Sequence, residues 1–379
     1  MKGKQGLVCM GLLLVLSSCS CHTGKQITAS GLQRKDFQTE VNGQHTDLFT
    51  LSNKQGMEVC ITNYGARVVS ILVPDRNGKR KDVVCGFSTI TEYMEQRQNF
   101  GSTVGRYIGR ILNARFTLDG VEYKLVPNNG KSGHISHGGN PGFADRIWKV
   151  EQADTHRVCL SYLSPDGENG FPGNLKVTLV YSLGEDDNAL DLTYEATTDA
   201  PTVLNLSHHS FFNISGNFTK SVEDQQLWVD ADRFTPYDDK KCVTGEYLPV
   251  AGTPLDFRMP HTIGECIDAD HPQLKVVNGY DHTWELNTKG DDTRPAAWVY
   301  DPASGRKMEI FTTEPGMQIY TGNGLKGKMT GKGGIAYPFR SAVCFETMHF
   351  QDSPNQPGFP STVLRPGEVF RSHTVYKFE

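Results

Sequence analysis

The sequence lacks most of the motifs that identify common classes of enzyme and binding protein. It contains no CxxC pair, no HxH and no HExxH, the spacings that would indicate a metal site. No P-loop occurs, and no Ser or Cys lies in a motif typical of a nucleophile. Basic clusters are absent beyond short runs such as residues 79–81, and the formal net charge is −5. We therefore expect neither nucleic-acid binding nor a metal site.

Long apolar runs are also scarce, and the one near the N-terminus resembles an export signal. Two lysines precede an apolar segment at residues 7–16, which is too short to span a bilayer. The stretch that follows, Leu-Ser-Ser-Cys ending at Cys19, is similar to a bacterial lipobox. We expect residues 1–19 to be a lipoprotein signal and Cys19 to carry a lipid anchor in the cell envelope, facing the periplasm. An ordinary cleaved signal is the alternative, and residues 20–34 have the small, polar composition of a tether.

Helical periodicity is weak, whereas short strand-like segments and turn signals recur along the chain. The 39 glycines and 19 prolines favour many turns over long helices. Residues 175–181 and 189–196 alternate apolar and polar side chains, as half-buried antiparallel strands do. Further strands are expected at residues 66–73, 82–85, 116–123 (a hairpin), 201–204, 298–300, 308–311, 342–345 and 370–378, with one short helix at residues 90–97. No long linker interrupts residues 35–379, which predicts one large antiparallel β-sandwich of the all-β class.

Cysteine usage leaves the redox state of the chain open. An envelope location would permit disulfides. However, Cys60, Cys85, Cys159 and Cys344 lie in or at the end of strand-like runs, where buried thiols fit as well as disulfides do.

A buried carboxylate is the first candidate for chemistry. The apolar run at residues 342–345 is long enough for one buried strand, and it ends at Glu346. A proline-rich loop follows at residues 352–360. Because a buried carboxylate is costly to desolvate unless it is paired or used, this pattern predicts a functional Glu346 at the end of a strand. A structural glutamate on an edge strand is the alternative.

Several polar side chains occur in unusual surroundings elsewhere in the chain. His137 lies beside two glycines, and His208 and His209 follow a strand, on which they point to opposite faces. The other candidates are Asp281 in an aromatic-flanked turn, Gln318, and the two arginines Arg106 and Arg110. Such a set suits a neutral polyhydroxylated ligand, since charged groups hold hydroxyls and a Glu/His pair moves protons. Solvated surface side chains are the alternative for each residue taken singly.

Taken together, the motifs resemble those of the aldose 1-epimerase (galactose mutarotase) family. The matching stretches are NYGA, GRYIGRI, SHGG followed by GFADRIW, FPGNL, NLSHHSFFNI, NGYDHTW, PGMQIYTGN, ETMHFQDSPNQPGFP and STVLRPGEVFRSHTVYKF, in the order of the family and over roughly residues 45–378. The resemblance implies a large β-sandwich, called a supersandwich, with the sugar in an open cleft. It also implies interconversion of the α and β anomers of a free aldohexose such as glucose or galactose, without a cofactor.

The resemblance also implies a role for each candidate residue. Glu346 matches the general base, His209 the general acid, and His137 an auxiliary position. The remaining matches, to sugar-binding positions, are Arg110, Asp281 and Gln318. A nearby carboxylate is expected to keep His209 protonated. Gly109 and His208 stand where many relatives have Asn, which leaves the preferred sugar open.

Two alternatives remain at this point. One is a hexose-phosphate epimerase of the same fold, which would need several basic residues around the cleft. The other is a lipid-anchored carbohydrate-binding protein without catalysis. The sequence leaves the oligomeric state open between a monomer and a dimer.

Overall fold

The computed structural model describes residues 26–379, so the expected signal and Cys19 lie outside the described residues. Strands dominate this range, as the sequence predicts, and among its residues no helix is both long and apolar enough to span a bilayer. The predicted short helix is present, and a second one, α2, was not anticipated. The helical elements are α1 (Ile90–Gln96), α2 (Pro272–Val277) and the 3₁₀ turns η1 (Arg34–Phe37), η2 (Leu112–Ala114), η3 (Gly130–Ser132), η4 (Phe143–Asp145), η5 (Glu168–Gly170), η6 (Lys332–Gly334) and η7 (Ser353–Asn355).

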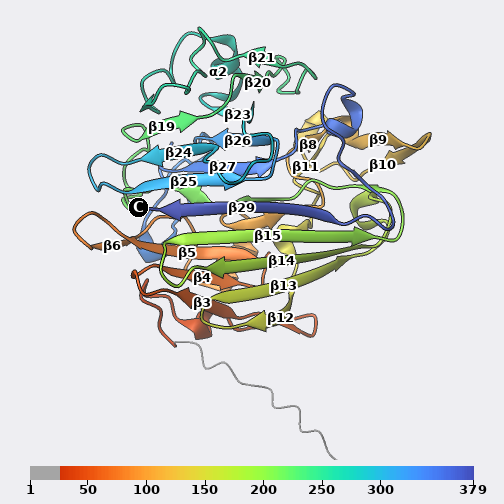
Figure 1. Cartoon of the computed structure of the whole chain (residues 1–379). Coiled ribbons are helices and arrows are strands. Elements are labelled where there is room, and N and C mark those ends of the chain that lie inside the picture. The colour runs from red at the N-terminus through yellow and green to blue at the C-terminus, as the bar shows by residue number, and fades with distance from the viewer. Residues whose placement is uncertain (1–25) are drawn as a thin grey trace, which may run out of the picture.

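A nine-stranded antiparallel sheet forms one layer of the molecule (Figure 1). Its strands alternate buried and accessible side chains, because one face packs on the core and the other faces solvent. In spatial order they are β12 (Lys149–Ala153), β13 (Arg157–Ser164), β14 (Leu175–Leu183), β15 (Ala189–Thr198), β29 (Phe370–Phe378), β25 (Lys307–Thr312), β24 (Ala297–Tyr300), β19 (Gln226–Val229) and β22 (His261–Thr262).

Two smaller sheets form the opposite layer, and the main hydrophobic core lies between the layers. The core joins Val68 and Phe345 of the smaller sheets to Leu179 and Ile310 of the large sheet, which confirms the predicted β-sandwich. One small sheet contains β3 (Leu48–Ser52), β4 (Glu58–Thr62), β5 (Arg67–Pro74) and β6 (Arg80–Asp82). The other, in spatial order, contains β18 (Phe211–Phe212), β27 (Val343–Met348), β26 (Gly316–Tyr320), β23 (Asp281–Glu285), β20 (Arg233–Thr235) and β21 (Leu248–Pro249).

Paired short strands complete the fold. The pairs are β1 (Glu40–Val41) with β2 (Gln44–His45), β7 (Ser102–Val104) with β17 (Ser207–His209), β8 (Arg110–Ile111) with β11 (Ile135–Ser136), β9 (Arg115–Leu118) with β10 (Val121–Lys124), and β16 (Thr202–Val203) with β28 (Val363–Leu364). The β9–β10 turn contains Asp119 and Gly120 at φ values of 52° and 80°, so this predicted hairpin uses the two positive angles of a type I′ turn.

The expected tether ends earlier than its composition suggests. Thr28 and Leu32 are buried, and a backbone bridge joins Ile27 to Gln33. The backbone nitrogen of Ala29 also donates a hydrogen bond to the Glu58 carboxylate at 2.7 Å. The chain from residue 28 onward therefore packs on the folded domain, with its backbone hydrogen-bonded to β4.

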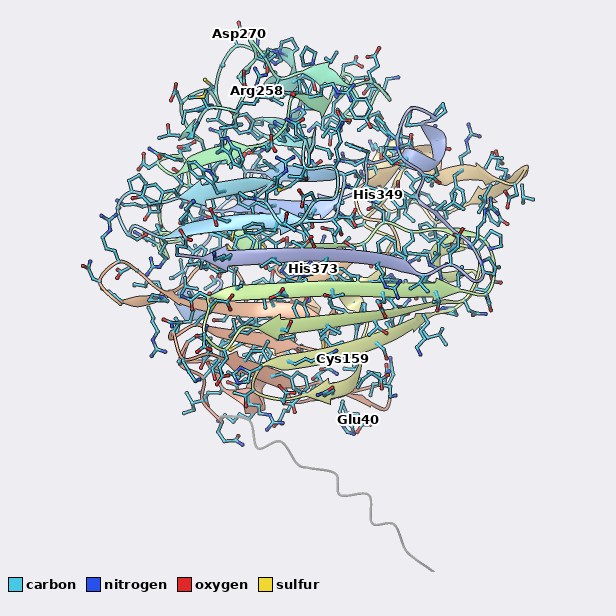
Figure 2. All side chains as sticks on the ribbon, viewed as in Figure 1. Glu40, Cys159, Arg258, Asp270, His349 and His373 are labelled. Atoms are coloured by element: carbon cyan, nitrogen blue, oxygen red, sulfur yellow. The ribbon has the colours of Figure 1, made fainter. Side chains whose placement is uncertain are left out.

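The outer face of the nine-stranded sheet is polar. Figure 2 shows Cys159 of β13 and His373 of β29 on this face.

Of the cysteines within residues 26–379, each has a free thiol, and Cys60, Cys85 and Cys344 are buried. These three cysteines agree with the interpretation as buried thiols, whereas Cys159 is only partly buried.

Candidate active site

One cavity of about 240 Å³ brings together the residues that the motifs singled out. It is lined by Arg110, His137, His209, Asp281, Gln318 and Glu346, together with Gln98, Asn99, Gly109, Ser136, Phe211, Tyr320, Met348 and Gln351. These side chains come from distant parts of the sequence. The sandwich places them on one face of the six-stranded sheet and in the loops beside it.

The register of three neighbouring strands positions the acidic side of the cavity. Thr283 of β23 lies opposite Gln318 of β26, and Gln318 lies opposite Glu346 of β27. The Gln318 amide nitrogen donates a hydrogen bond of 2.6 Å to Asp281. Two details of the sequence prediction are wrong. Strand β27 continues to Met348, so Glu346 lies within the strand, and Asp281 begins a strand and does not lie in a turn.

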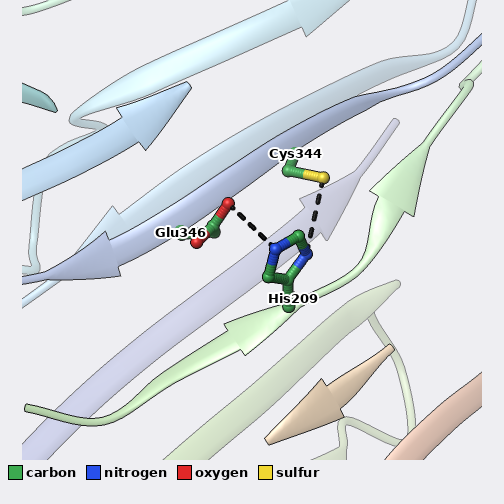
Figure 3. A group of neighbouring side chains, drawn as sticks. All are labelled: His209, Cys344 and Glu346. Atoms are coloured by element: carbon green, nitrogen blue, oxygen red, sulfur yellow. Dashed lines mark hydrogen bonds and ion pairs between the residues drawn. The ribbon is translucent and has the colours of Figure 1, made fainter. Parts of the chain in front are cut away.

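His209 and Glu346 face each other (Figure 3), and both line the cavity. The His209 Nε2 atom lies 3.5 Å from the Glu346 carboxylate, and the two side chains are only 7% and 4% exposed. The Phe211 ring stacks on the imidazole with a centroid separation of 5.1 Å, which fixes the plane of the ring. The pair is therefore buried and still lines the cavity.

The neighbouring His208 points the other way, as strand alternation predicts. Its Nε2 atom lies 2.7 Å from the Ser210 hydroxyl, and its Nδ1 atom lies 3.4 Å from the Tyr181 hydroxyl. His208 is thus a buried, hydrogen-bonded core residue. Its difference from many relatives does not alter the cavity lining.

Burial controls the protonation of the His209–Glu346 pair. Desolvation, with a smaller contribution from the negative charge of Asp281, raises the pKa of Glu346 well above its usual value. Desolvation, assisted by His137, lowers the pKa of His209 well below its usual value. The expectation that a carboxylate keeps His209 protonated is therefore wrong, because 3.5 Å is too long for a strong charge-assisted bond to offset desolvation.

The opposite side of the cavity is formed by a strained loop and a strand end. His137 has a φ of 53°, and its ring meets the His209 ring edge to face at a centroid distance of 5.5 Å. Burial and the nearby Arg110 charge lower the pKa of His137 to about 4, which favours a neutral imidazole. Arg106, the other arginine of the motif, is buried and donates to backbone carbonyls such as Pro172, so its role is structural.

Sequence reasoning missed three side chains next to the cavity. Gln351 donates a 2.7 Å hydrogen bond to the Tyr237 hydroxyl, and it also contacts Gln318. The Cys344 Sγ atom lies 3.6 Å from His209 Nδ1. Cys344 could have been found from its spacing, since it stands two residues before Glu346 on one strand and so shares its face. Tyr237 gave no comparable signal, because only the long-range register brings it here.

His209, Cys344 and Glu346 each have one atom that could ligate a metal ion, and these atoms lie within 4.8 Å of one another. However, Glu346 faces Nε2 and Cys344 faces Nδ1, on two different edges of one imidazole (Figure 3). An imidazole presents one nitrogen to a given ion, so the three donors surround the ring and do not converge on one point.

The comparisons with known proteins agree with this geometry. The family model described as aldose 1-epimerase matches residues 47–377. Galactose mutarotase from Sus scrofa is 39% identical over 330 residues, covering 87% of this chain and 93% of the relative. Aldose 1-epimerase from Escherichia coli is 36% identical over 339 residues, covering 89% and 96%.

Solved structures show the same similarity. The crystal structure of an aldose epimerase homologue from C. elegans superposes with a TM-score of 0.81 at 31% identity, covering 88% of this chain and 99% of that one. Galactose 1-epimerase from Lactobacillus acidophilus gives a TM-score of 0.78 at 28% identity, covering 90% and 97%. The ordered motifs, the sandwich and these matches together establish that the chain belongs to the aldose 1-epimerase family.

Proposed function

We propose that this protein is an isomerase that interconverts the α and β anomers of free aldohexoses by opening and closing the sugar ring. The observation that carries the proposal is the buried His209–Glu346 pair, 3.5 Å apart in a cavity that also presents Arg110, Asp281 and Gln318. Proton donors and acceptors on both sides of one pocket are what this reaction needs.

Ring opening requires two proton transfers. In the direction assigned by the family motif, Glu346 takes the proton of the C1 hydroxyl while His209 Nε2 gives a proton to the ring oxygen. The C1–O5 bond then breaks and leaves an open-chain aldehyde, a protonated Glu346 and a neutral His209. Each transfer contributes on the order of 10²–10⁴ in rate.

Ring closure reverses the two roles. The aldehyde turns about the C1–C2 bond, His209 takes the proton of the O5 hydroxyl, and Glu346 protonates the carbonyl oxygen as O5 attacks C1. The pair carries one transferable proton throughout, so no exchange with solvent is needed. The raised pKa of Glu346 and the lowered pKa of His209 favour a protonated Glu346 and a neutral His209 over the ion pair from which ring opening starts. This neutral arrangement is the one that accompanies the open chain.

The remaining cavity residues suit the hydroxyls of a neutral sugar. Asp281 and Gln318 are already joined by a 2.6 Å hydrogen bond, which holds an acceptor and a donor in fixed directions. Arg110 is the single Lys or Arg side chain among the described residues that line the cavity. One cation beside two carboxylates gives no support for the hexose-phosphate alternative. An intact acid/base pair likewise gives none for a non-catalytic binding protein.

Polarimetry on freshly dissolved α-glucose and α-galactose tests the proposal, with protein that lacks residues 1–19. We expect the optical rotation to reach equilibrium much faster than in buffer, and the relative rates to identify the preferred sugar. The same uncatalysed rate with and without protein, for both sugars, would reject the proposed activity.

We further propose that the protein is exported and anchored to the cell envelope through a lipid on Cys19, facing the periplasm. The lysines, short apolar segment and Leu-Ser-Ser-Cys stretch at the N-terminus support this placement. Replacing Cys19 by Ser should release the protein from the membrane fraction, and metabolic labelling with a fatty acid should mark the wild type alone. A wild-type protein that stays soluble without detergent and takes up no label would instead indicate an ordinary cleaved signal.

A further inference from the structure

Both ring nitrogens of His209 have a partner on the same strand (Figure 3). Nε2 lies 3.5 Å from the Glu346 carboxylate, and Nδ1 lies 3.6 Å from the Cys344 sulfur. Cys344 and Glu346 are two residues apart in β27, so strand alternation turns both side chains towards the imidazole. Phe211, which stacks on that ring, is the cross-strand partner of Cys344. The position of this sulfur is therefore set by the sheet register.

The proposed reaction gives the two nitrogens different tasks. Nε2 gives and takes the transferred proton, whereas Nδ1 must keep its own proton in every step. A neutral imidazole whose proton moved to Nε2 would present no acceptor to the sugar or to Glu346. Leaving the buried Nδ1–H without a partner would cost about 1–3 kcal/mol. The catalytic cycle thus requires an acceptor at Nδ1.

Cys344 provides a side-chain hydrogen-bond partner at Nδ1. Burial raises the pKa of its thiol well above the usual value, so the sulfur is uncharged. An uncharged sulfur is a weak acceptor, which orients the ring without holding it as an imidazolium. The contrast is His349, whose Nδ1 lies 2.7 Å from Glu314 and whose pKa is raised despite burial because of that carboxylate.

We propose that Cys344 is a positioning residue: its Sγ accepts the Nδ1–H of His209 and so keeps Nε2 directed at Glu346 and the sugar. This inference rests on the proposed function, which gives Nε2 its task. Cys344 is not among the residues that line the cavity, so it acts through His209 and does not touch the sugar.

The test compares two buried thiols of the same hydrophobic cluster. Cys344→Val removes the acceptor and keeps an apolar side chain. Cys85→Val makes the same change at a buried thiol that is not one of the two side-chain partners of the His209 ring nitrogens. We expect Cys344→Val to lower kcat about tenfold, equivalent to roughly 1.4 kcal/mol, with KM changed less than about twofold. Cys85→Val should leave both constants near wild type, and Cys344→Ser, which retains an acceptor, should recover part of kcat.

Nitrogen-15 NMR of histidine-labelled protein gives a readout that does not depend on activity, with His209→Asn assigning the signals. We expect His209 to carry its proton on Nδ1 in the wild type and to populate both tautomers in Cys344→Val. A wild-type proton on Nε2, a tautomer unchanged in Cys344→Val, or equal losses of kcat in the two valine variants would each overturn the inference. If the wild type failed to catalyse anomer exchange, the proposed function would fall, while the tautomer measurement would still decide the Cys344 contact.

Discussion

The cavity and the outer part of the molecule both hold histidines beside carboxylates, but their protonation differs. In the cavity, His209 and Glu346 are 3.5 Å apart, and burial shifts their pKa values away from the charged forms. Outside it, His373 lies 2.7 Å from Asp292 and 3.3 Å from Asp191, and hydrogen bonds, first to Asp191, raise its pKa to about 8. Figure 2 shows His373 on the open face of the large sheet.

Separation and exposure explain this difference. The His373 side chain is 33% exposed and has two short contacts with carboxylates, so solvent and hydrogen bonds sustain its charge. His209 is 7% exposed and has one long contact, so neither compensates for desolvation. The outer cluster therefore acts as an ion pair between neighbouring strands and a loop, whereas the proposed reaction gives the inner pair a proton that moves. The following predictions test this contrast, from the largest expected effect to the smallest.

The largest effect is expected from removing the acid/base function of the inner pair. Glu346→Gln keeps the shape of the side chain but cannot carry the transferred proton, so kcat for anomer exchange should fall about 10²–10⁴-fold with little change in KM. The control is Glu314→Gln, which alters the carboxylate of the His349 pair outside the cavity. It should lower the melting temperature and leave kcat near wild type. Steady-state polarimetry measures kcat, and thermal melts measure the melting temperature. Equal kcat in the two variants would contradict the assignment of proton transfer to the His209–Glu346 pair alone.

The next prediction concerns Asp281, whose negative charge lies near Glu346. Asp281 contributes to the raised pKa of Glu346 and accepts a 2.6 Å hydrogen bond from Gln318. Asp281→Asn should therefore lower kcat/KM about 10–100-fold, the range for a lost charge-assisted bond of about 1.5–3 kcal/mol. The pKa of Glu346 should also fall, because a nearby negative charge is removed.

The sign of the pH effect follows from the one-proton requirement. Above the raised pKa of Glu346 the pair loses its transferable proton, so this pKa sets the alkaline limb of the pH–rate profile. Asp281→Asn should move that limb to lower pH, while Asp119→Asn, an exposed carboxylate paired with Arg365, should leave it in place. An alkaline limb that stays fixed in Asp281→Asn would show that Asp281 does not act on Glu346.

Particular residues show how far the sequence allowed the site to be predicted. The motifs singled out Glu346, His209 and Gln318, and the structure places all three in one cavity. Alternation within a strand also separated His209 from His208, because side-chain direction has a period of two. The all-β class followed from the same period in β14 and β15.

Other features could not be derived because they depend on contacts between distant segments. Tyr237 reaches Gln351 over 114 residues of sequence, and no local pattern predicts that contact. The protonation of His209 was predicted with the wrong sign, since the sequence shows a neighbouring carboxylate but not its 3.5 Å separation or the depth of burial. The sequence predicts that the strand ends at the charged Glu346. Strand β27 instead continues to Met348, which is also buried.

A smaller effect is expected from the cavity wall at Gly109. Its φ of 74° is accessible to Asn, but a Cβ there would lie 2.5 Å from the Gln351 Cγ. Gly109→Asn should displace Gln351 from the Tyr237 hydroxyl and raise KM about fivefold, the equivalent of one hydrogen bond of roughly 1 kcal/mol. The control is Gly78→Asn, with a φ of 77° and open space around it, which should leave KM unchanged. An unchanged or lower KM in Gly109→Asn would show that Gln351 is not needed for sugar binding.

The smallest effect should come from the outer cluster, and it should appear in stability alone. His373 has a folded-state pKa of about 8, above the usual unfolded value of about 6.5. Its contribution to stability is therefore fully present below about pH 6.5 and is lost as the pH rises through about 8. Because the side chain is partly exposed, we expect a contribution of only about 0.5 kcal/mol, or roughly 1 °C in melting temperature. Wild type should melt above His373→Gln at pH 6 and together with it at pH 9, with equal kcat at both values. A difference that grows with pH, or a kcat that falls in His373→Gln, would show that the outer cluster is not the simple ion pair that distinguishes it from the cavity.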